Sequence, residues 1–412
     1  MIQFNRFVLD NGLRVLVHED HSTPMAIVNV MYDVGSKDEN PEKTGFAHLF
    51  EHLMFGGSIH IPDYDEPLQR AGGENNAYTT NDLTNYYCQL PAENIETAFW
   101  LESDRMLSLA FSKKSLEVQR KVVCEEFKEH YINKPYGDIW HKMRELAYKK
   151  HPYRWMTIGK ELSHVENVQI TDVKDFFFKH YRPANAILVV AGKVKAEEAK
   201  RLAEKWFGDI PMGEKYNRNL PREPKQQEAR SLEVKADVPL DAFIKTWHMG
   251  GRLDQSYYIA DLISEILGGG ASSRMYQSLV KEKQLFSNLD CYHYGTVDAG
   301  LLAVEGKLVK GVNMLDAEKA VAEEIEKIKN YLITDAELQK VKNKTESAVA
   351  FEDMSVMNRA NSLAFYELLG DATLMNTELE RYNVITAEDI LNYSKELFDD
   401  TNSNTIHYYS KN

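Results

Sequence analysis

The strongest pattern in this chain lies in the segment Gly45-Phe46-Ala47-His48-Leu49-Phe50-Glu51-His52-Leu53-Met54-Phe55. Its large apolar residues recur every three or four positions, which predicts a helix with one buried face. His48, Glu51 and His52 lie on a different face of that helix. Upstream, Asn40-Pro41 predicts the helix start, and Gly56-Gly57 predicts its end.

The polar face of this helix has the spacing of a metal site. Two imidazoles one turn apart can bind the same ion, and a hydrolytic zinc site uses three protein ligands and one open position. His48 and His52 supply two of the ligands. Glu51 could not easily bind the same ion beside both histidines, so we predict that it acts as the general base. A single histidine on a helix is usually structural, but the whole H-x-x-E-H pattern is fairly specific.

The third ligand is expected from a helix that begins near Ser112 or Ser115 and ends near Tyr131. It carries the carboxylates Glu125, Glu126 and Glu129. Glu126 shares a broad stripe with apolar neighbours and can point inward, whereas Glu125 lies about 100° around the helix. An ordinary solvated carboxylate is the alternative, and spacing alone leaves the choice open.

Composition restricts the class of protein. The 412 residues are 43% hydrophobic and 27% charged, which is typical of a globular protein with two or more domains. The sequence has no apolar run of transmembrane length, so no membrane partner is expected. The net charge of −14 makes nucleic acid a poor partner. Three cysteines and the lack of an apolar leader predict a cytoplasmic protein, or a periplasmic one if Met1 replaces a removed signal peptide.

The two halves of the chain resemble each other. Ala26 to Asp38 reads AIVNVMYDVGSKD and Ala242 to Asp254 reads AFIKTWHMGGRLD, at an offset of 216 residues. Ile170-Thr171 recurs as Ile385-Thr386. These matches predict an internal duplication, with domains at 1–215 and 237–412 joined by a polar linker at 216–236. The second half lacks the metal motif, so only the first domain is expected to be catalytic.

A segment rich in Asn, Thr and Tyr follows the metal helix, from Gly72 to Tyr87. It predicts two short strands about a turn at Asn81-Asp82. An ordinary surface hairpin is one interpretation. The other is an edge strand, with Asn76, Ala77 and Tyr78, that pairs with an extended peptide.

Taken together, the motifs resemble those of the pitrilysin family, which includes insulin-degrading enzyme and the mitochondrial processing peptidase. The inverted zinc motif H-x-x-E-H marks the inverzincins. The resemblance covers essentially the whole chain. It is carried by Leu9-Asp10-Asn11-Gly12-Leu13, His48 to His52, Asn76-Ala77-Tyr78-Thr79, Arg120 to Phe127, His151-Pro152-Tyr153 and Ala191-Gly192.

The resemblance implies an α+β fold of the LuxS/processing-peptidase-like metallohydrolase type. It has two homologous domains, each a mostly antiparallel sheet with helices packed on one side. It implies one Zn²⁺ per chain, held by His48, His52 and Glu126, with Glu51 as general base. Asn76-Ala77 would lie on the strand that binds substrate by β-augmentation. The implied function is a zinc metalloendopeptidase that hydrolyses unfolded peptides in a clamshell made of two chains.

Two departures from the family pattern bear on activity. Gln119 stands where the family often has a second glutamate. In the second half, an alignment without gaps places Val280 and Ser287 where active clamshells carry an arginine and a tyrosine that grip the substrate carbonyl. If one residue is missing between them, Lys281 takes the place of the arginine, but the phenol is still absent. We therefore expect a heterodimer whose other, homologous subunit supplies both groups. The alternatives are a homodimer, a non-catalytic scaffold subunit and, more weakly, a zinc hydrolase of a non-peptide substrate.

Overall fold

The computed structural model describes residues 1–214 and 216–411, and the chain divides into two compact units. The first unit comprises Met1–Glu129, Trp155–Leu220 and Val349–Thr377. The second comprises His130–Arg154, Pro221–Ala348 and the chain from Glu378 on. Each unit is built on its own sheet, which confirms the predicted two-domain α+β class.

The first unit contains a six-stranded sheet in the order β1-β2-β6-β3-β5-β4. Only the β2–β6 pair is parallel among these strands. The buried side chains of the central strand β6 alternate between the two faces of the sheet. The strands are β1 (Asn5–Val8), β2 (Arg14–Glu19), β3 (Met25–Tyr32), β4 (Glu74–Thr79), β5 (Thr84–Pro91) and β6 (Ala186–Gly192).

The second unit repeats this topology. Its five strands run in the order β7-β11-β8-β10-β9, which matches β2-β6-β3-β5-β4 strand for strand. Ala26 pairs with Gly192 and Ala242 with Tyr408, so both strands keep the offset of 216. This shared order and register support the predicted duplication. The strands are β7 (Arg230–Ala236), β8 (Ala242–His248), β9 (Phe286–Tyr294), β10 (Leu301–Leu308) and β11 (Ser403–Ser410).

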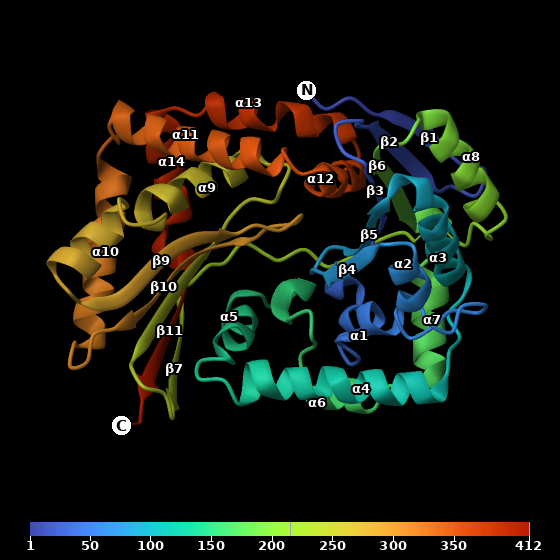
Figure 1. Cartoon of the computed structure of the whole chain (residues 1–412). Helices are drawn as coiled ribbons and strands as arrows, with labels where there is room; N and C mark the ends of the chain where they lie inside the picture. Colours follow the sequence, from blue (N-terminus) through green and yellow to red (C-terminus); the bar gives the residue numbers. More distant parts are fainter. Residues whose placement is uncertain (215, 412) are drawn as a thin grey trace. The chain divides into compact units, whose positions relative to one another are not determined.

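Helices surround both sheets (Figure 1). Those of the first half are α1 (Phe46–Leu53), α2 (Asp65–Arg70), α3 (Ile95–Leu107), α4 (Lys113–Phe127), α5 (Ile139–Ala147), α6 (Leu162–Glu166), α7 (Ile170–His180) and α8 (Ala196–Phe207). Those of the second half are α9 (Gln255–Gly268), α10 (Met314–Asn330), α11 (Asp335–Glu352), α12 (Val356–Leu368), α13 (Glu378–Asn383) and α14 (Ala387–Leu397).

Each sheet receives one helix from the other half of the sequence. In the first unit, α12 packs on β3 and β6, where Leu363 lies in one apolar cluster with Ile187. In the second unit, α5 packs on β8 and β11, where Met143 lies in one cluster with Ile244. These helices cover the faces opposite α3 and α8 in the first unit and α9 and α10 in the second. Both faces of each sheet are therefore covered, beyond the one-sided packing that was expected.

This exchange changes the domain boundaries expected from sequence, 1–215 and 237–412. Residues 130–154 belong to the second unit and 349–377 to the first. The predicted linker 216–236 is also shorter, because Arg230–Ala236 forms strand β7. Most side chains of this edge strand are not buried, so its composition is as polar as that of a linker.

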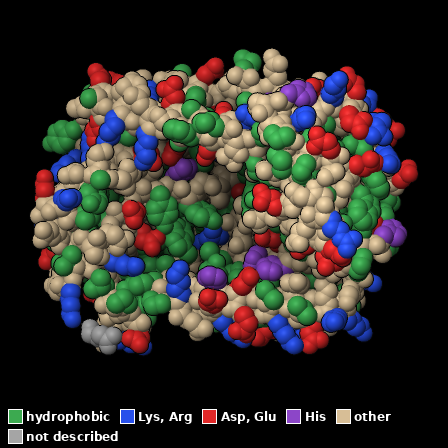
Figure 2. All heavy atoms as spheres, in the orientation of Figure 1, with side chains coloured by type: hydrophobic (Ala, Val, Ile, Leu, Met, Phe, Trp, Pro, Cys, Tyr) green, Lys and Arg blue, Asp and Glu red, His purple; other side chains and the backbone are tan. Residues whose placement is uncertain are grey.

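Figure 2 shows acidic and basic side chains interspersed over the visible face. Among the residues described, none of the helices combines the length and apolar character that crossing a bilayer requires.

Candidate metal centre

Helix α1 carries the histidines and begins later than the sequence suggests. Its first residue is Phe46, preceded by Gly45 in a left-handed conformation with φ of 88°. The expected start at Asn40-Pro41 is wrong, because the Asn40 carbonyl accepts a hydrogen bond from the Lys43 N–H and closes a turn there. The predicted apolar face is buried, and Phe50 stacks on Phe176 and Tyr181.

Three side chains converge beside α1. The Nε2 atom of His48 lies 3.7 Å from Oε2 of Glu126, and Nε2 of His52 lies 3.5 Å from the same oxygen. Ligands that bind zinc tetrahedrally at about 2.1 Å are roughly 3.4 Å apart. The three residues therefore fit a zinc ion, and they form the one such group found among the described residues.

Helix α4 decides which glutamate joins the histidines. It packs against α1 (Figure 1) and turns Glu126 toward it, with 33% of that side chain exposed. Glu125 points away, is 73% exposed and forms an ion pair with Lys128 at 2.8 Å. Of the carboxylates that sequence left open, the structure brings only Glu126 to the imidazoles. Gln119, two turns earlier on α4, is partly buried.

The environment of His48 favours its metal-binding form. Burial, and then the neighbouring His52, lower the pKa of His48 to about 4. The imidazole is therefore neutral at physiological pH, and the neutral ring is the form that ligates metals. Its Nδ1 atom is buried without a hydrogen-bond partner among the described residues.

Glu51 lies beside this cluster but is not part of it. Its Oε2 atom accepts a hydrogen bond from Thr79 Oγ1 at 2.6 Å. Burial raises the pKa of Glu51, and the bond from Thr79 and the nearby His52 partly offset that rise. Sequence reasoning missed the role of Thr79. The signal that could have indicated this role is the position of Thr79 at the end of the predicted strand that contains Asn76, Ala77 and Tyr78.

Strand β4 carries the predicted peptide-binding residues and is the end strand of its sheet. It contacts α1, the helix that carries the histidines (Figure 1). The side-chain oxygen of Asn76 accepts the Ala77 N–H at 2.8 Å. Tyr78 is partly buried against the cluster that contains α12. Pairing of a peptide with Ala77 would require the Asn76 side chain to move aside.

The second unit has no counterpart of this cluster in its matching helix. At the offset of 216, α9 places Ser264 and Gly268 where α1 has its histidines, and both are buried. Val280 packs against the apolar core of this unit. Ser287 donates a hydrogen bond to the carbonyl of Lys307 at 3.1 Å. These two positions present neither a guanidinium nor a phenol group.

Comparisons with known proteins match both halves of this chain to one family of peptidases. Residues 14–158 match the family model described as insulinase (peptidase family M16), and residues 167–345 match the model described as peptidase M16 inactive domain. The zinc protease PqqE of Helicobacter pylori is 29% identical over 404 residues, which cover 97% of this chain and 91% of the relative. An uncharacterized zinc protease, YmxG of Bacillus subtilis, is 25% identical, with 95% of each chain covered.

A solved structure is similar over its full length. The crystal structure of a protease from Helicobacter pylori superimposes with a TM-score of 0.92 at 27% identity, and 99% of this chain and 100% of that chain are covered. The similarity therefore extends over both units and is not limited to the segment with the histidines.

Proposed function

We propose that this chain, which belongs to the insulinase (M16) family of peptidases, is a zinc metalloendopeptidase that hydrolyses unfolded peptides. The observation that carries the proposal is the approach of His48 and His52 to one oxygen of Glu126, at distances that suit tetrahedral zinc. Relatives named zinc proteases support the same metal.

The metal ligands would be His48, His52 and Glu126, with one zinc ion per chain. When bound, zinc supplies a Lewis acid that polarises the scissile carbonyl and lowers the pKa of water toward about 7. The neutral His48 ring needs no deprotonation before it binds the ion, because burial already keeps its pKa near 4.

Glu51 would move the proton in this reaction. The hydrogen bond from Thr79 to its Oε2 atom orients the carboxyl group, which would take a proton from the attacking water. The same carboxyl group then delivers that proton to the leaving amine. The raised pKa of Glu51 suits this exchange, since a base works best when its pKa approaches the working pH.

The substrate would bind along β4. Because β4 is an end strand, an extended peptide can pair with its backbone at Asn76, Ala77 and Tyr78. A folded protein rarely presents a free extended segment, so the proposed substrates are unfolded peptides. This placement brings the peptide beside α1, which contacts β4.

We also propose that the active form is a heterodimer. Val280 is packed into a core and Ser287 is engaged with a backbone carbonyl, so neither can grip a substrate carbonyl. A homologous subunit with an arginine and a tyrosine at these positions would supply the missing donors. Titrating this chain with such a subunit and measuring peptide cleavage tests the point. Full activity of the chain alone would count against it.

The central test combines metal analysis with a Glu51→Gln variant and a quenched peptide. We expect one zinc per chain in both proteins and a loss of cleavage of at least about 100-fold in the variant, because the base is removed and the ligands stay. Glu125→Gln is the matched control on α4 and should keep wild-type activity. Bound zinc without Glu51-dependent cleavage, even with the partner subunit, would instead favour a scaffold role.

A further inference from the structure

A short buried junction connects β3 with the turn that leads to α1. It consists of Ser36, Lys37, Asp38 and Glu39, and none of these side chains is appreciably exposed. Three consecutive charged residues are seldom buried unless each has a partner. The partners of these charged side chains show which segments of the first unit contact this junction.

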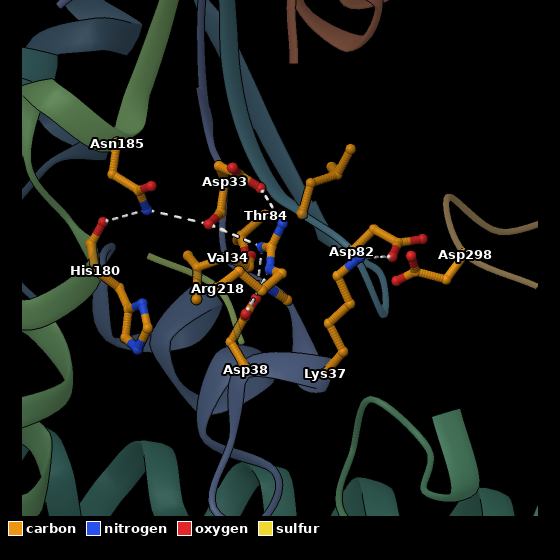
Figure 3. Close-up of polar contacts among 12 residues, drawn as sticks. Asp33, Val34, Lys37, Asp38, Asp82, Thr84, His180, Asn185, Arg218 and Asp298 are labelled. Atoms are coloured by element: carbon orange, nitrogen blue, oxygen red, sulfur yellow. Dashed lines mark hydrogen bonds and ion pairs between the residues drawn. The ribbon is translucent and has the colours of Figure 1, made fainter. Parts of the chain in front are cut away.

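Lys37 and Asp38 fix the junction in place. Lys37 forms an ion pair at 2.6 Å with Asp82, in the turn between β4 and β5 (Figure 3). Asp38 receives two hydrogen bonds at 2.8 Å from Arg218, and Arg218 also pairs with Asp33 at 2.8 Å. Figure 3 shows the Arg218 guanidinium between these two carboxylates. The backbone that precedes Glu39 is therefore held from two directions.

Glu39 reaches from this fixed backbone to the start of α1. Its Oε2 atom accepts the Gly45 N–H and its Oε1 atom accepts the Ala47 N–H, both at 2.9 Å. The first N–H groups of a helix have no partner within the helix. Gly45, the residue before α1, has no side chain that could cap them. Glu39 therefore supplies the cap from six residues upstream.

We propose that Glu39 is a positioning residue for the metal centre, which it serves by fixing the start of α1 and thereby the rotation of His48 and His52 relative to Glu126. Ala47, whose N–H bonds to Glu39, immediately precedes His48 in the chain. Because α1 has only eight residues, the first turn of this helix governs the orientation of the His48 and His52 rings. The proposal rests on the zinc site proposed above.

The decisive variant is Glu39→Gln, which keeps the size of the side chain. Both oxygens of a carboxyl group can accept a hydrogen bond, even when one of them carries a proton. An amide has one acceptor oxygen, and its NH₂ group would face the other helix N–H. We expect zinc affinity, measured by competition with a chelator well below the unfolding temperature, to fall about 10-fold. The exposed Glu42→Gln, in the same loop, should bind zinc as wild type does.

A second control separates positioning from a general loss of stability. Ile406→Val trims a buried side chain in the other unit and lowers the unfolding temperature without touching α1. Its zinc affinity should not change. If Glu39→Gln does not fold, Glu39→Asp provides the same measurement, because the shorter side chain keeps the carboxyl group but cannot reach the two helix N–H groups.

The outcomes separate the two proposals. Absence of zinc from the wild-type chain would overturn the metal site, and the role of Glu39 with it. Zinc binding by the wild type with an unchanged affinity in the Glu39 variant would overturn only the positioning role. A loss shared equally by Ile406→Val would overturn it as well, because stability would then explain the effect.

Discussion

At the scale of single residues, the surroundings of a side chain control its chemistry. His48 and Glu51 are one turn apart on α1, yet burial lowers the pKa of the imidazole and raises that of the carboxyl group. Both shifts favour the neutral form, as desolvation requires. The result is a neutral ligand beside a carboxyl group with a raised affinity for a proton, which is the pairing that the proposed hydrolysis needs.

Glu39 gives a pH prediction at this scale. Burial raises its pKa to about 8, and the Ala47 and Gly45 N–H groups only partly offset that rise. The folded state therefore keeps a proton that the unfolded chain releases near pH 4.5. The contribution of Glu39 to the free energy of unfolding is largest below about pH 4.5, falls as pH rises, and levels off above about pH 8.

Denaturant unfolding at several pH values measures this dependence. In the metal-free protein, Glu39→Gln should flatten the decline in stability between about pH 4.5 and pH 8, since the amide does not titrate. Glu42→Gln should leave the decline as it is in the wild type. An identical decline in the Glu39 variant and the wild type would show that other groups cause it.

At the scale of elements, the candidate site depends on one strand edge beside one short helix. Strand β4 ends its sheet, contacts α1 and carries Thr79, which bonds to Glu51. The strand that would bind the peptide is thus joined directly to the proposed base. A peptide paired with β4 would lie next to the ligands without any further element having to move toward it.

Ala77→Pro tests the use of this edge. The Ala77 N–H donates to the side chain of Asn76. Because the Thr80 N–H bonds to Leu83 across the hairpin, alternation along the strand turns the Ala77 N–H to the outer edge, and proline removes that donor. We expect kcat/KM for unfolded peptides to fall at least about 10-fold, mainly through KM, while zinc content stays at the wild-type level. Unchanged peptide kinetics in a folded variant would show that substrates do not pair with β4.

At the scale of the whole molecule, the two sequence halves exchange equivalent helices. α5 lies at 139–147 and α12 at 356–368, which the offset of 216 relates, and each packs on the sheet built mostly by the other half. Neither half of the sequence can therefore complete its own sheet. This reciprocal exchange makes the folding of the two units interdependent.

Fragments test this interdependence. A fragment of residues 1–215 lacks α12 and should expose the apolar face that Leu16, Ile27 and Ile187 form, so we expect it to aggregate or bind a hydrophobic dye. Joining residues 349–377 to its end by a flexible linker should reduce dye binding and restore cooperative unfolding. A monomeric 1–215 fragment with cooperative unfolding would contradict the expectation.

The sequence by itself determined the features that depend on local spacing. Periodicity predicted the helix with His48, Glu51 and His52, turn residues predicted the hairpin about Asn81-Asp82, and the repeat at 216 predicted the duplicated sheets. The family resemblance and the α+β fold are confirmed. Such signals can be read because neighbours along the chain share one helix or strand.

Only the tertiary structure decided which distant groups meet. Packing placed Glu126, and not Glu125, beside the histidines. It brought Thr79 to Glu51. It also placed the start of α1 after Gly45, where Glu39 caps the helix, and not at Asn40-Pro41. The tertiary structure also assigned α5, from the first half of the sequence, to the second unit and α12, from the second half, to the first unit. The physical reason is that these contacts depend on how separate elements pack, and the spacing of residues within one element carries no information about that packing.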